Sequence, residues 1–252
     1  MTYLKQPIRG ALALISLTLI IGCASTTKEL TAPSPEDPWE STNRSIYAFN
    51  KGVDQVLLRP VAHTYDQITP KPAKAGISNF FDNLASPWVT SQLLLQGRFV
   101  DGSEQFGRFL INTVYGVGGL FDVADHNNLP NHETDLGATL ATWGWKESRF
   151  VMLPLLGPAT VRDGLGQITE MTIDPVDQAL RDRTGPGITA LNVIQMRAGF
   201  LGFDESLEDA YDEYAFVRDG WLQRRNFQLF GDDASLPDYD AFLEEHDDTP
   251  SP

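Results

Sequence analysis

The chain is 252 residues long and acidic, with 19 Lys and Arg residues against 34 Asp and Glu and a formal net charge of −15. Its 42% hydrophobic and 21% charged residues are typical of a folded protein of one or two domains. The shortage of basic residues excludes a nucleic-acid-binding protein, because phosphate backbones require a basic face. A single cysteine excludes an intramolecular disulfide and any zinc site with two or more cysteines.

The N-terminus predicts a lipoprotein signal peptide over residues 1–22. Lys5 and Arg9 precede the apolar run Ala11–Ile21, which is too short to span the roughly 30 Å hydrocarbon core of a bilayer. The run ends in Ile20-Ile21-Gly22-Cys23, which resembles a bacterial lipobox, although the first lipobox position is more often Leu. We therefore expect a diacylglyceryl group on Cys23, with a generic secretory signal or an uncleaved anchor as the alternatives.

Both ends of the mature chain are expected to be flexible. Residues 23–38 are rich in Thr, Ser, Pro and Glu and predict a lipidated tether. Cleavage removes two basic residues and no acidic one, which makes the net charge −17. Ala24 follows the cysteine, and by resemblance to lipoproteins of double-membraned bacteria this favours sorting to the outer membrane. Residues 232–252 hold eight acidic residues and no Lys or Arg, which predicts a disordered acidic tail facing water.

Between these ends, residues 39–231 predict one domain of helices separated by Pro and Gly. Strand-like alternation is scarce and only Phe150–Leu153 predicts a short strand, so we expect an all-α fold. Pro60 and Pro87 are expected to interrupt helices, and Ser103 and Thr134 to cap the helices that follow them. The expected helices cover residues 39–59, 61–68, 73–84, 88–95, 104–115, 135–142, 158–171, 187–201 and a longer stretch from Asp204 towards Phe230.

Several segments are more apolar than a surface helix of a soluble protein requires, Trp88–Leu95 and Phe150–Val161 among them. None reaches the 18 or more apolar residues of a transmembrane helix. They are either core helices of a water-soluble domain or helices that lie in the bilayer plane with their apolar faces among the acyl chains.

Motifs for catalysis or cofactor binding are missing from the sequence. There is no G-x-S-x-G, H-E-x-x-H or G-x-x-x-x-G-K-[ST], and Gly116-Val117-Gly118-Gly119 lacks the third glycine of a dinucleotide fingerprint. We expect no enzyme, no metal and no cofactor other than the lipid on Cys23. An alternative metal site would use His126 and His132 with Asp122, Asp125 and Glu133, but a polar loop explains these residues more simply.

An ordered series of motifs covers about residues 37–175. It begins with Asp37–Arg44 and Phe49-Asn50 and continues through Arg59-Pro60-Val61, Asn79–Leu84, Pro87, Leu95-Gln96-Gly97, Arg108–Thr113, Gly116–Ala124, Asp135–Leu140 and Leu153–Asp163. In this order the motifs are similar to those of the MlaA/VacJ family of lipoproteins. The chain departs from the family at Lys146–Phe150, where a glycine-rich stretch and Pro-Tyr are usual, and at Leu136, where an aromatic residue is usual.

The resemblance implies an outer-membrane lipoprotein, anchored on the periplasmic side, whose short amphipathic helices form a flat ring or doughnut in the plane of the membrane. A central amphipathic channel would give phospholipid mislocalised in the outer leaflet a path towards the periplasm, without covalent chemistry. Members of the family pass the lipid to a soluble periplasmic phospholipid carrier and associate with trimeric porins. The resemblance therefore implies membrane phospholipids, a carrier and a porin as partners.

A headgroup crossing an apolar ring requires a polar path, because a bare charge in hydrocarbon costs several kcal/mol. Polar residues inside the apolar motifs are candidates for that path, and arginine could hold a phosphate bidentately. The alternative is that these residues pair with one another or cap helix ends. The candidates are Asn43, Arg44, Arg108, Asp122, Arg162 and Asp163, and Gly116, Gly118, Gly119 and Gly157 are the expected hinge or tight-packing glycines.

The sequence is compatible with three functions. The leading one is non-enzymatic retrograde transport of phospholipid, which removes mislocalised lipid from the outer leaflet and maintains lipid asymmetry. The alternative is a lipid-anchored scaffold or binding lipoprotein of the cell envelope without a lipid channel. A lipid hydrolase is the third, but it requires a nucleophile activated by an adjacent base, and the sequence shows no Ser/His/Asp arrangement.

Overall fold

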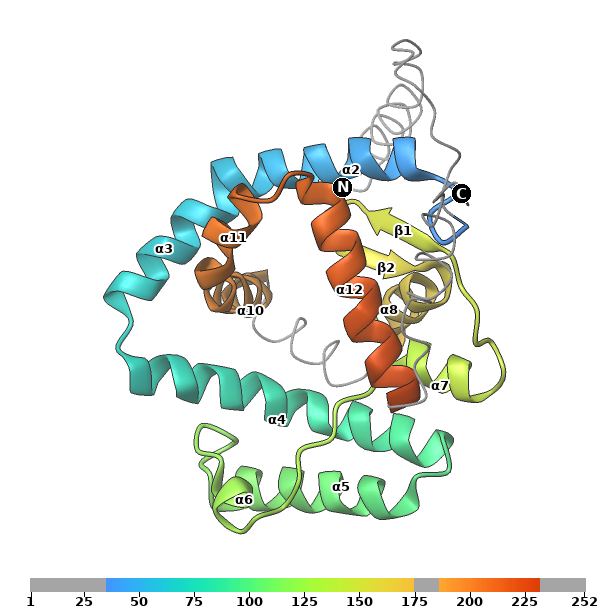
Figure 1. Ribbon diagram of the computed structural model, residues 1–252. Helices are drawn as coiled ribbons and strands as arrows, with labels where there is room; N and C mark the ends of the chain where they lie inside the picture. The colour runs from blue at the N-terminus through green and yellow to red at the C-terminus, as the bar shows by residue number, and fades with distance from the viewer. Residues whose placement is uncertain (1–34, 175–185, 232–252) are drawn as a thin grey trace, which may run out of the picture. The chain divides into compact units, whose positions relative to one another are not determined.

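The computed structural model describes residues 35–174 and 186–231 (Figure 1). The chain divides into two units, Met1–Pro33 and Ser34–Pro252, and every described residue belongs to the second. The expected signal peptide, Cys23, most of the tether and the acidic tail lie outside the described residues. All helices and strands of the described chain belong to the second unit.

Helices make up most of this unit, and a two-stranded antiparallel sheet pairs Phe150 with Thr160 and Leu153 with Gly157. The prediction of a helical fold with few strands is confirmed. In chain order the elements are α2 (Glu40–Val53), the π-helix η1 (Asp54–Leu58), α3 (Arg59–Ile68), α4 (Lys71–Leu95), α5 (Phe99–Val114), α6 (Val123–His126), α7 (Leu136–Thr142), β1 (Phe150–Leu153), β2 (Gly157–Thr160), α8 (Val161–Ile173), α10 (Pro186–Gly199), the 3₁₀-helix η2 (Leu201–Phe203), α11 (Asp204–Glu208) and α12 (Glu213–Phe230).

The elements of this unit contact one another in a closed circuit (Figure 1). α2 continues through η1 into α3, and the chain then turns into α4. α4 contacts α7, α7 packs on α8, α8 contacts β1, and β1 returns to α2. α5 packs along α4, and α10 contacts both α3 and α4. Segments far apart in the sequence therefore lie side by side, which places α10 against the first third of the chain.

The two expected proline breaks are wrong. Helix continues from α2 to α3 because η1 widens the turn, so that the N–H of Arg59 donates to the carbonyl of Asp54, and Pro60 falls among the first residues of α3, where a missing N–H is tolerated. α4 runs unbroken through Pro87. The packing of α4 on α5 supports this helix, where the buried Gln105 donates to Ser86 Oγ at 3.1 Å.

Four other boundaries also differ from the prediction. α5 begins one turn earlier, and Ser103 lies inside it with its hydroxyl bonded to the carbonyl of Val100. Asp135, rather than Thr134, caps α7 by accepting a hydrogen bond from the N–H of Ala138 at 2.7 Å. The expected helix from residue 158 starts at Val161, because its first residues pair with β1 as β2. The long helix from Asp204 is divided between α11 and α12.

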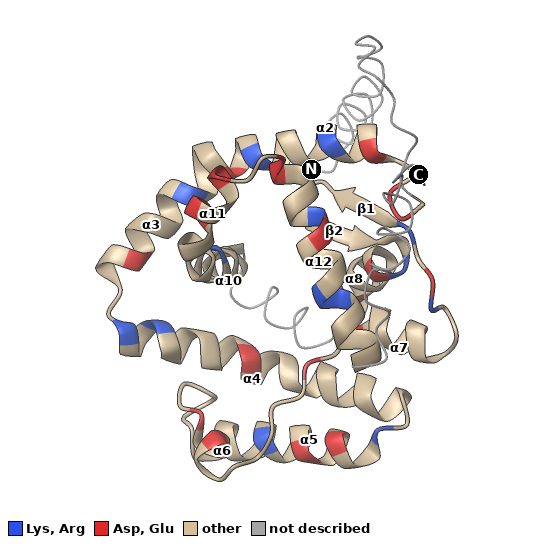
Figure 2. Cartoon of the chain, in the orientation of Figure 1, with Lys and Arg blue, Asp and Glu red and all other residues tan. Residues whose placement is uncertain are grey.

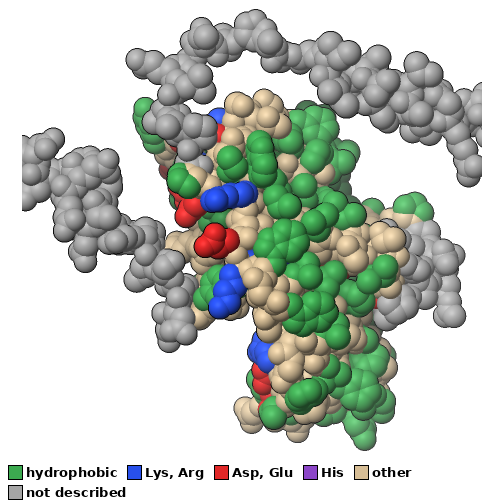
Figure 3. Space-filling view, turned by 90° about the vertical axis from the view of Figure 1, so that its right-hand side faces the viewer, with side chains coloured by type: hydrophobic (Ala, Val, Ile, Leu, Met, Phe, Trp, Pro, Cys, Tyr) green, Lys and Arg blue, Asp and Glu red, His purple; other side chains and the backbone are tan. Residues whose placement is uncertain are grey.

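The buried apolar core is small and the exposed apolar surface is large. Phe150, Met152 and Tyr214 form a buried cluster with Ile46, Tyr47, Trp221 and Leu222 packed against it. Large apolar side chains are exposed on most helices, including Val56 on η1, Ile68 on α3, Phe99 on α5 and Ile168 on α8. Figure 3 shows that hydrophobic side chains also cover much of the face that it views, with charged side chains along one edge. Exposed apolar side chains gathered in this way are typical of a surface that meets lipid or protein.

Within the described residues, no helix has the length and apolar character needed to cross a membrane.

Candidate functional site

An apolar groove with a volume of about 620 Å³ lies between η1–α3 and α10. This volume lies within the range of about 300–1,000 Å³ usual for ligand pockets. Val61 and Val193 remain exposed in the groove. We call this hollow the α10 groove; its lining consists of Leu57, Leu58, Val61, Pro186, Thr189, Ala190, Val193 and Ile194.

A pair of charges lies beside the α10 groove without being part of its lining. On α10, Arg197 follows the lining residues Ala190 and Ile194 by seven and three residues, so it shares their helix face. Arg197 Nε donates to Asp54 Oδ1 at 2.6 Å and Nη2 donates to Asp54 Oδ2 at 2.9 Å. The apolar groove therefore has a charged pair next to it, which we call its polar end.

The polar end extends onto α11 and carries both signs of charge. Arg197 Nη2 also contacts Asp204 Oδ1 at 2.9 Å, and Arg59 bridges Asp204 at 3.0 Å and Glu208 at 2.7 Å. The hydrogen bonds to Asp54 raise the pKa of Arg197, so it stays charged. Its Nη1 is buried and has no hydrogen-bond partner among the described residues. An unmatched buried donor is costly, and a ligand oxygen would satisfy it.

Sequence analysis missed both Asp54 and Arg197. Arg197 is the only charged residue of α10, whose other residues are apolar, small or neutral polar (Figure 2). An isolated arginine in an apolar helix is the signal that could have identified Arg197, because such a charge needs a partner. Its partner lies 143 residues earlier in the chain, and nothing in the local sequence indicates that distance.

The predicted residues Arg108 and Asp122 lie together between α5 and α6. Arg108 is buried, and its Nη2 donates to Asp122 Oδ2 at 2.6 Å while Nη1 donates to the carbonyl of Leu129. Asp122 also accepts from Asn112 Nδ2 at 3.0 Å and caps α6. Burial raises the pKa of Asp122, but the hydrogen bonds from Asn112, the backbone of Asp125 and Arg108 outweigh it and lower the pKa overall. Arg108 and Asp122 therefore pair with each other, and Asp122 caps α6, which are the contacts expected if these residues have a structural role.

Arg162 and Asp163 belong to a second cluster with Arg225 of α12. Arg162 is almost wholly buried, contacts Asp163 Oδ1 at 3.0 Å and donates to the carbonyls of Trp145 and Lys146. Arg225 joins Asp163 at 2.8 Å to Asp135, which it holds through two bonds of 2.7 Å. Asp135, Asp163 and Arg225 line a pocket of about 260 Å³, which we call the α12 pocket, whereas Arg162 lies outside its lining. The rest of the lining consists of Pro158, Ala159, Gln167, Glu170, Trp221, Arg224 and Gln228.

Asn43 and Arg44 lie at the junction of α2 with α12. Asn43 is buried, donates to Asp37 Oδ1 at 2.7 Å and accepts from the N–H of Met152 at 2.9 Å. Arg44 forms a bidentate pair with Asp212 at 3.0 and 2.7 Å and lies over the ring of Tyr214. The hydrogen bond from Arg44 lowers the pKa of Asp212 to about 2. All six predicted polar residues thus have partners in the chain, and their part in a lipid path stays a prediction.

The four predicted glycines are held in place by close contacts or by the backbone. A Cβ on Gly116 would lie 2.2 Å from the carbonyl oxygen of Phe121, which leaves no room for a side chain. Gly119 combines a φ of +93° with a Cβ position 2.5 Å from Asn83 Cβ. Gly118 and Gly157 have φ values of +70° and +86°, which favour glycine. A role of these glycines as hinges stays a prediction.

Predominant helices, a wide apolar surface and an apolar groove with a charged end are together typical of helical proteins that contact lipid. The family model described as MlaA lipoprotein matches residues 35–228, and the chain belongs to this family. The resemblance found in the motifs is therefore confirmed.

Two relatives are named "Intermembrane phospholipid transport system lipoprotein MlaA", one from Shigella flexneri and one from Escherichia coli (strain K12). Each is 38% identical over 222 residues, which covers 86% of this chain and 87% of the relative. A solved structure described as the "Structural basis for maintenance of bacterial outer membrane lipid asymmetry" is similar with a TM-score of 0.67 and 36% identity. The match covers 77% of this chain and 98% of that one.

Proposed function

We propose that this chain is an outer-membrane lipoprotein that removes mislocalised phospholipid from the outer leaflet and passes it towards a periplasmic carrier. Such retrograde transport maintains the lipid asymmetry of the outer membrane. The observation that carries the proposal is 38% identity over most of the chain to lipoproteins named for intermembrane phospholipid transport. The fold adds support, since it is similar to a structure described in terms of outer-membrane lipid asymmetry.

The α10 groove fits one part of a phospholipid at each end. Its apolar lining suits an acyl chain, for which burial contributes about 0.8 kcal/mol per CH₂. Its charged end offers arginines for a phosphate and carboxylates for an ammonium group. We therefore place the lipid path along this groove, with Arg197 rather than the six predicted polar residues as the group nearest the headgroup.

Attachment of the protein to the membrane would come from two sources. A diacylglyceryl group on Cys23, with further acylation, would anchor the chain on the periplasmic side of the outer membrane almost permanently. The exposed apolar residues of η1, α3, α5 and α8 would lie among acyl chains in the membrane plane.

A trimeric porin and a soluble periplasmic phospholipid carrier are the proposed protein partners. Lipid movement needs no covalent chemistry, so we propose neither catalysis nor a cofactor.

Deletion and complementation test the function. Deleting the gene should raise the amount of aminophospholipid labelled by a membrane-impermeant reagent at the cell surface and should increase detergent sensitivity. Wild-type protein should restore both, and Cys23→Ala protein should be lost from the membrane fraction. Unchanged surface phospholipid after deletion would exclude the proposal.

The lipid path is tested by placing a charge in the α10 groove. Val193→Glu places a carboxylate in the apolar groove, where an acyl chain would have to pass it, so the variant should fail to complement the deletion at normal protein level. Met196→Glu is the matched control because Met196 also lies on α10, is 55% exposed against 43% for Val193, and does not line the groove. Met196→Glu should complement fully. Full complementation by Val193→Glu would place the lipid path elsewhere.

The scaffold alternative makes a different prediction for purified protein. A scaffold without a lipid path should carry no phospholipid in native mass spectrometry, whereas the transport protein should carry one that Val193→Glu removes. Release of lysophospholipid from vesicles would identify a hydrolase. Three histidines lie among the described residues. His132 contacts Glu104, His126 contacts the backbone oxygen of Asp122, and His63 is exposed on α3, so none of the three is hydrogen-bonded to a serine or threonine hydroxyl of the described chain.

A further inference from the structure

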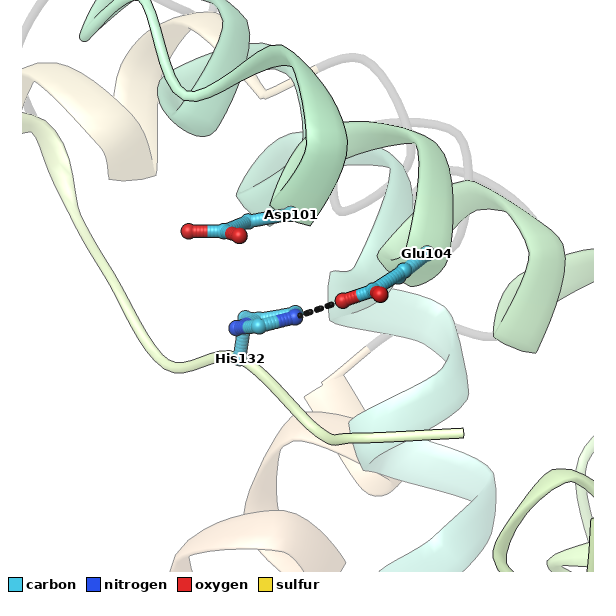
Figure 4. A group of neighbouring side chains, drawn as sticks. All are labelled: Asp101, Glu104 and His132. Atoms are coloured by element: carbon cyan, nitrogen blue, oxygen red, sulfur yellow. Dashed lines mark hydrogen bonds and ion pairs between the residues drawn. The ribbon is translucent and has the colours of Figure 1, made fainter. Parts of the chain in front are cut away.

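Two carboxylates and a histidine meet on α5, away from the residues of the α10 groove (Figure 4). Asp101 and Glu104 lie one turn apart on the first half of α5, so their side chains share one face of the helix. His132 reaches them from the loop between α6 and α7. One ligand atom of each residue lies within 4.8 Å of the others, and all three residues are partly buried.

The histidine is held in position by the neighbour of Glu104. The backbone N–H of His132 donates to Gln105 Oε1 at 3.0 Å, and Gln105 is itself buried and donates to Ser86 Oγ. His132 Nε2 lies 2.8 Å from Glu104 Oε2. The backbone contact therefore presents the imidazole to the carboxylates without using either of its ring nitrogens.

The Asp101 carboxylate is held by a neighbouring arginine. Arg98 Nε donates to Asp101 Oδ2 at 2.7 Å, which orients this carboxylate. A carboxylate has two oxygens with about four lone-pair sites, so Asp101 keeps capacity for another ligand. Partners that orient the ligands are a regular part of metal sites, where their loss lowers affinity about 10–100-fold.

We propose that Asp101, Glu104 and His132 bind one divalent transition-metal ion, with Zn²⁺ as the representative. One imidazole nitrogen and two carboxylate oxygens provide three protein ligands, and water completes a tetrahedral site. Zn–ligand bonds of about 2.0–2.2 Å in a tetrahedral site set the ligand atoms about 3.4 Å apart. The 2.8 Å contact of His132 Nε2 with Glu104 Oε2 and the separations of up to 4.8 Å within the group lie on either side of this distance, so small side-chain movements bring the three ligands to it. Ca²⁺ and Mg²⁺ are disfavoured because they take six or more oxygen ligands.

The ion would fasten the loop of residues 127–135 to α5. This loop leads directly into Asp135, which caps α7 and holds Arg225 of α12. Zinc should therefore slow amide hydrogen exchange in the loop. The site does not depend on the transport proposal, and its readouts involve no lipid.

Zinc titration of the full chain in detergent tests the site. After removal of metal with EDTA, titration against a chromogenic chelator should show one tight Zn²⁺ per chain, unaffected by millimolar Mg²⁺. His132→Gln and Glu104→Gln should each weaken zinc binding at least tenfold and abolish the zinc-dependent exchange protection of residues 127–135.

Two other histidines serve as controls. His126→Gln removes an exposed histidine of the same loop, and His246→Gln removes the one within the acidic C-terminal sequence. Both should bind zinc as tightly as the wild type. Absence of tight zinc binding, or equal affinity in His132→Gln and wild-type protein, would overturn the proposal. If His132→Gln loses helical circular dichroism, Asp101→Asn replaces it, and wild-type zinc affinity in that variant would overturn the proposal equally.

Discussion

The α10 groove and the α12 pocket differ in how their polar groups are used. In the α12 pocket, the side chains of Arg225 and Asp163 are each 9% exposed and are bonded to each other and to their neighbours. In the α10 groove, the lining is apolar and partly exposed. Each region has one buried arginine nitrogen without a partner among the described residues, Arg197 Nη1 beside the groove and Arg225 Nε in the pocket. The α12 pocket is also the smaller, at about 260 Å³ against 620 Å³.

This difference separates a structural cluster from a binding site. A buried charge destabilises the fold unless it is paired, and the carboxylates and most of the arginine nitrogens of the α12 pocket are already used in pairing within the chain. The apolar lining of a groove is unfavourably exposed to water, and an apolar ligand that covers it lowers the free energy. We therefore expect changes in the α12 pocket to act on folding and changes in the α10 groove to act on lipid binding.

The largest expected effect is on stability, from Arg225→Met. The substitution keeps a long apolar side chain but removes the charge that pairs with Asp135 and Asp163, and the Asp163 side chain is only 9% exposed. Since Asp163 retains Arg162 as a partner, the loss should lie at the lower end for a broken buried pair, about 3 kcal/mol. Urea unfolding followed by circular dichroism measures it.

Arg224→Met provides the matched control on the same helix, because Arg224 borders the α12 pocket but does not belong to the charge cluster of Asp135, Asp163 and Arg225. Arg224 is 65% exposed and approaches Glu133 only to 3.9 Å, so its substitution should change the unfolding free energy by less than about 0.5 kcal/mol. Equal effects of the two substitutions would contradict the view that the α12 pocket is a structural cluster.

The next effect concerns lipid affinity. Ala190→Trp should fill part of the α10 groove without adding charge, and we expect it to weaken binding of a fluorescent phospholipid at least tenfold, or about 1.4 kcal/mol. Met196→Trp, outside the groove on the same helix, should bind as the wild type does. Unfolding free energies should stay close to the wild-type value in both, since neither change disturbs a paired charge. Unaltered binding by Ala190→Trp would remove the distinction between the two regions.

The sequence predicted one of these regions better than the other. Arg162 and Asp163 were candidates because they stand in a motif. Asp163 lines the α12 pocket and Arg162 contacts Asp163 from outside it, although Arg225 was not recognised. The α10 groove was not anticipated at all. It joins residues 57–61 with residues 186–194, and such a contact depends on how α3, α4 and α10 pack.

The prediction of a helix break at Pro87 was wrong because it also depends on packing between helices, which the local sequence does not show. Pro87 predicts a helix break because it lacks an N–H and its ring clashes with the preceding turn. Packing of α4 on α5 keeps the helix continuous, with Ser86 bonded both to Gln105 and to the carbonyl of Asp82. By contrast, Phe150–Leu153 was predicted correctly, since the alternating burial of this strand is encoded in four adjacent residues.

The smallest expected effect is the pH dependence of the pair between Arg44 and Asp212, which sharpens the contrast with Arg225. The hydrogen bond from Arg44 lowers the pKa of Asp212 to about 2, below its ordinary value of 3.8. A lowered carboxyl pKa stabilises the folded state above its ordinary value, and this stabilisation is lost as the pH falls through the folded-state value. Because the Asp212 side chain is 35% exposed, solvent screening should limit the contribution to less than about 1 kcal/mol.

Urea unfolding of wild-type and Arg44→Met protein between pH 6 and pH 2.5 measures this contribution. The difference in unfolding free energy should be greatest near pH 6 and shrink below pH 4, leaving the contact of Arg44 with the ring of Tyr214, which does not titrate in this range. Addition of 0.5 M NaCl at pH 6 should also reduce the difference, whereas the effect of Arg225→Met should hardly change with salt. A salt-insensitive difference for Arg44→Met would mean that this pair is screened from water as Arg225 is, and that exposure does not distinguish the two.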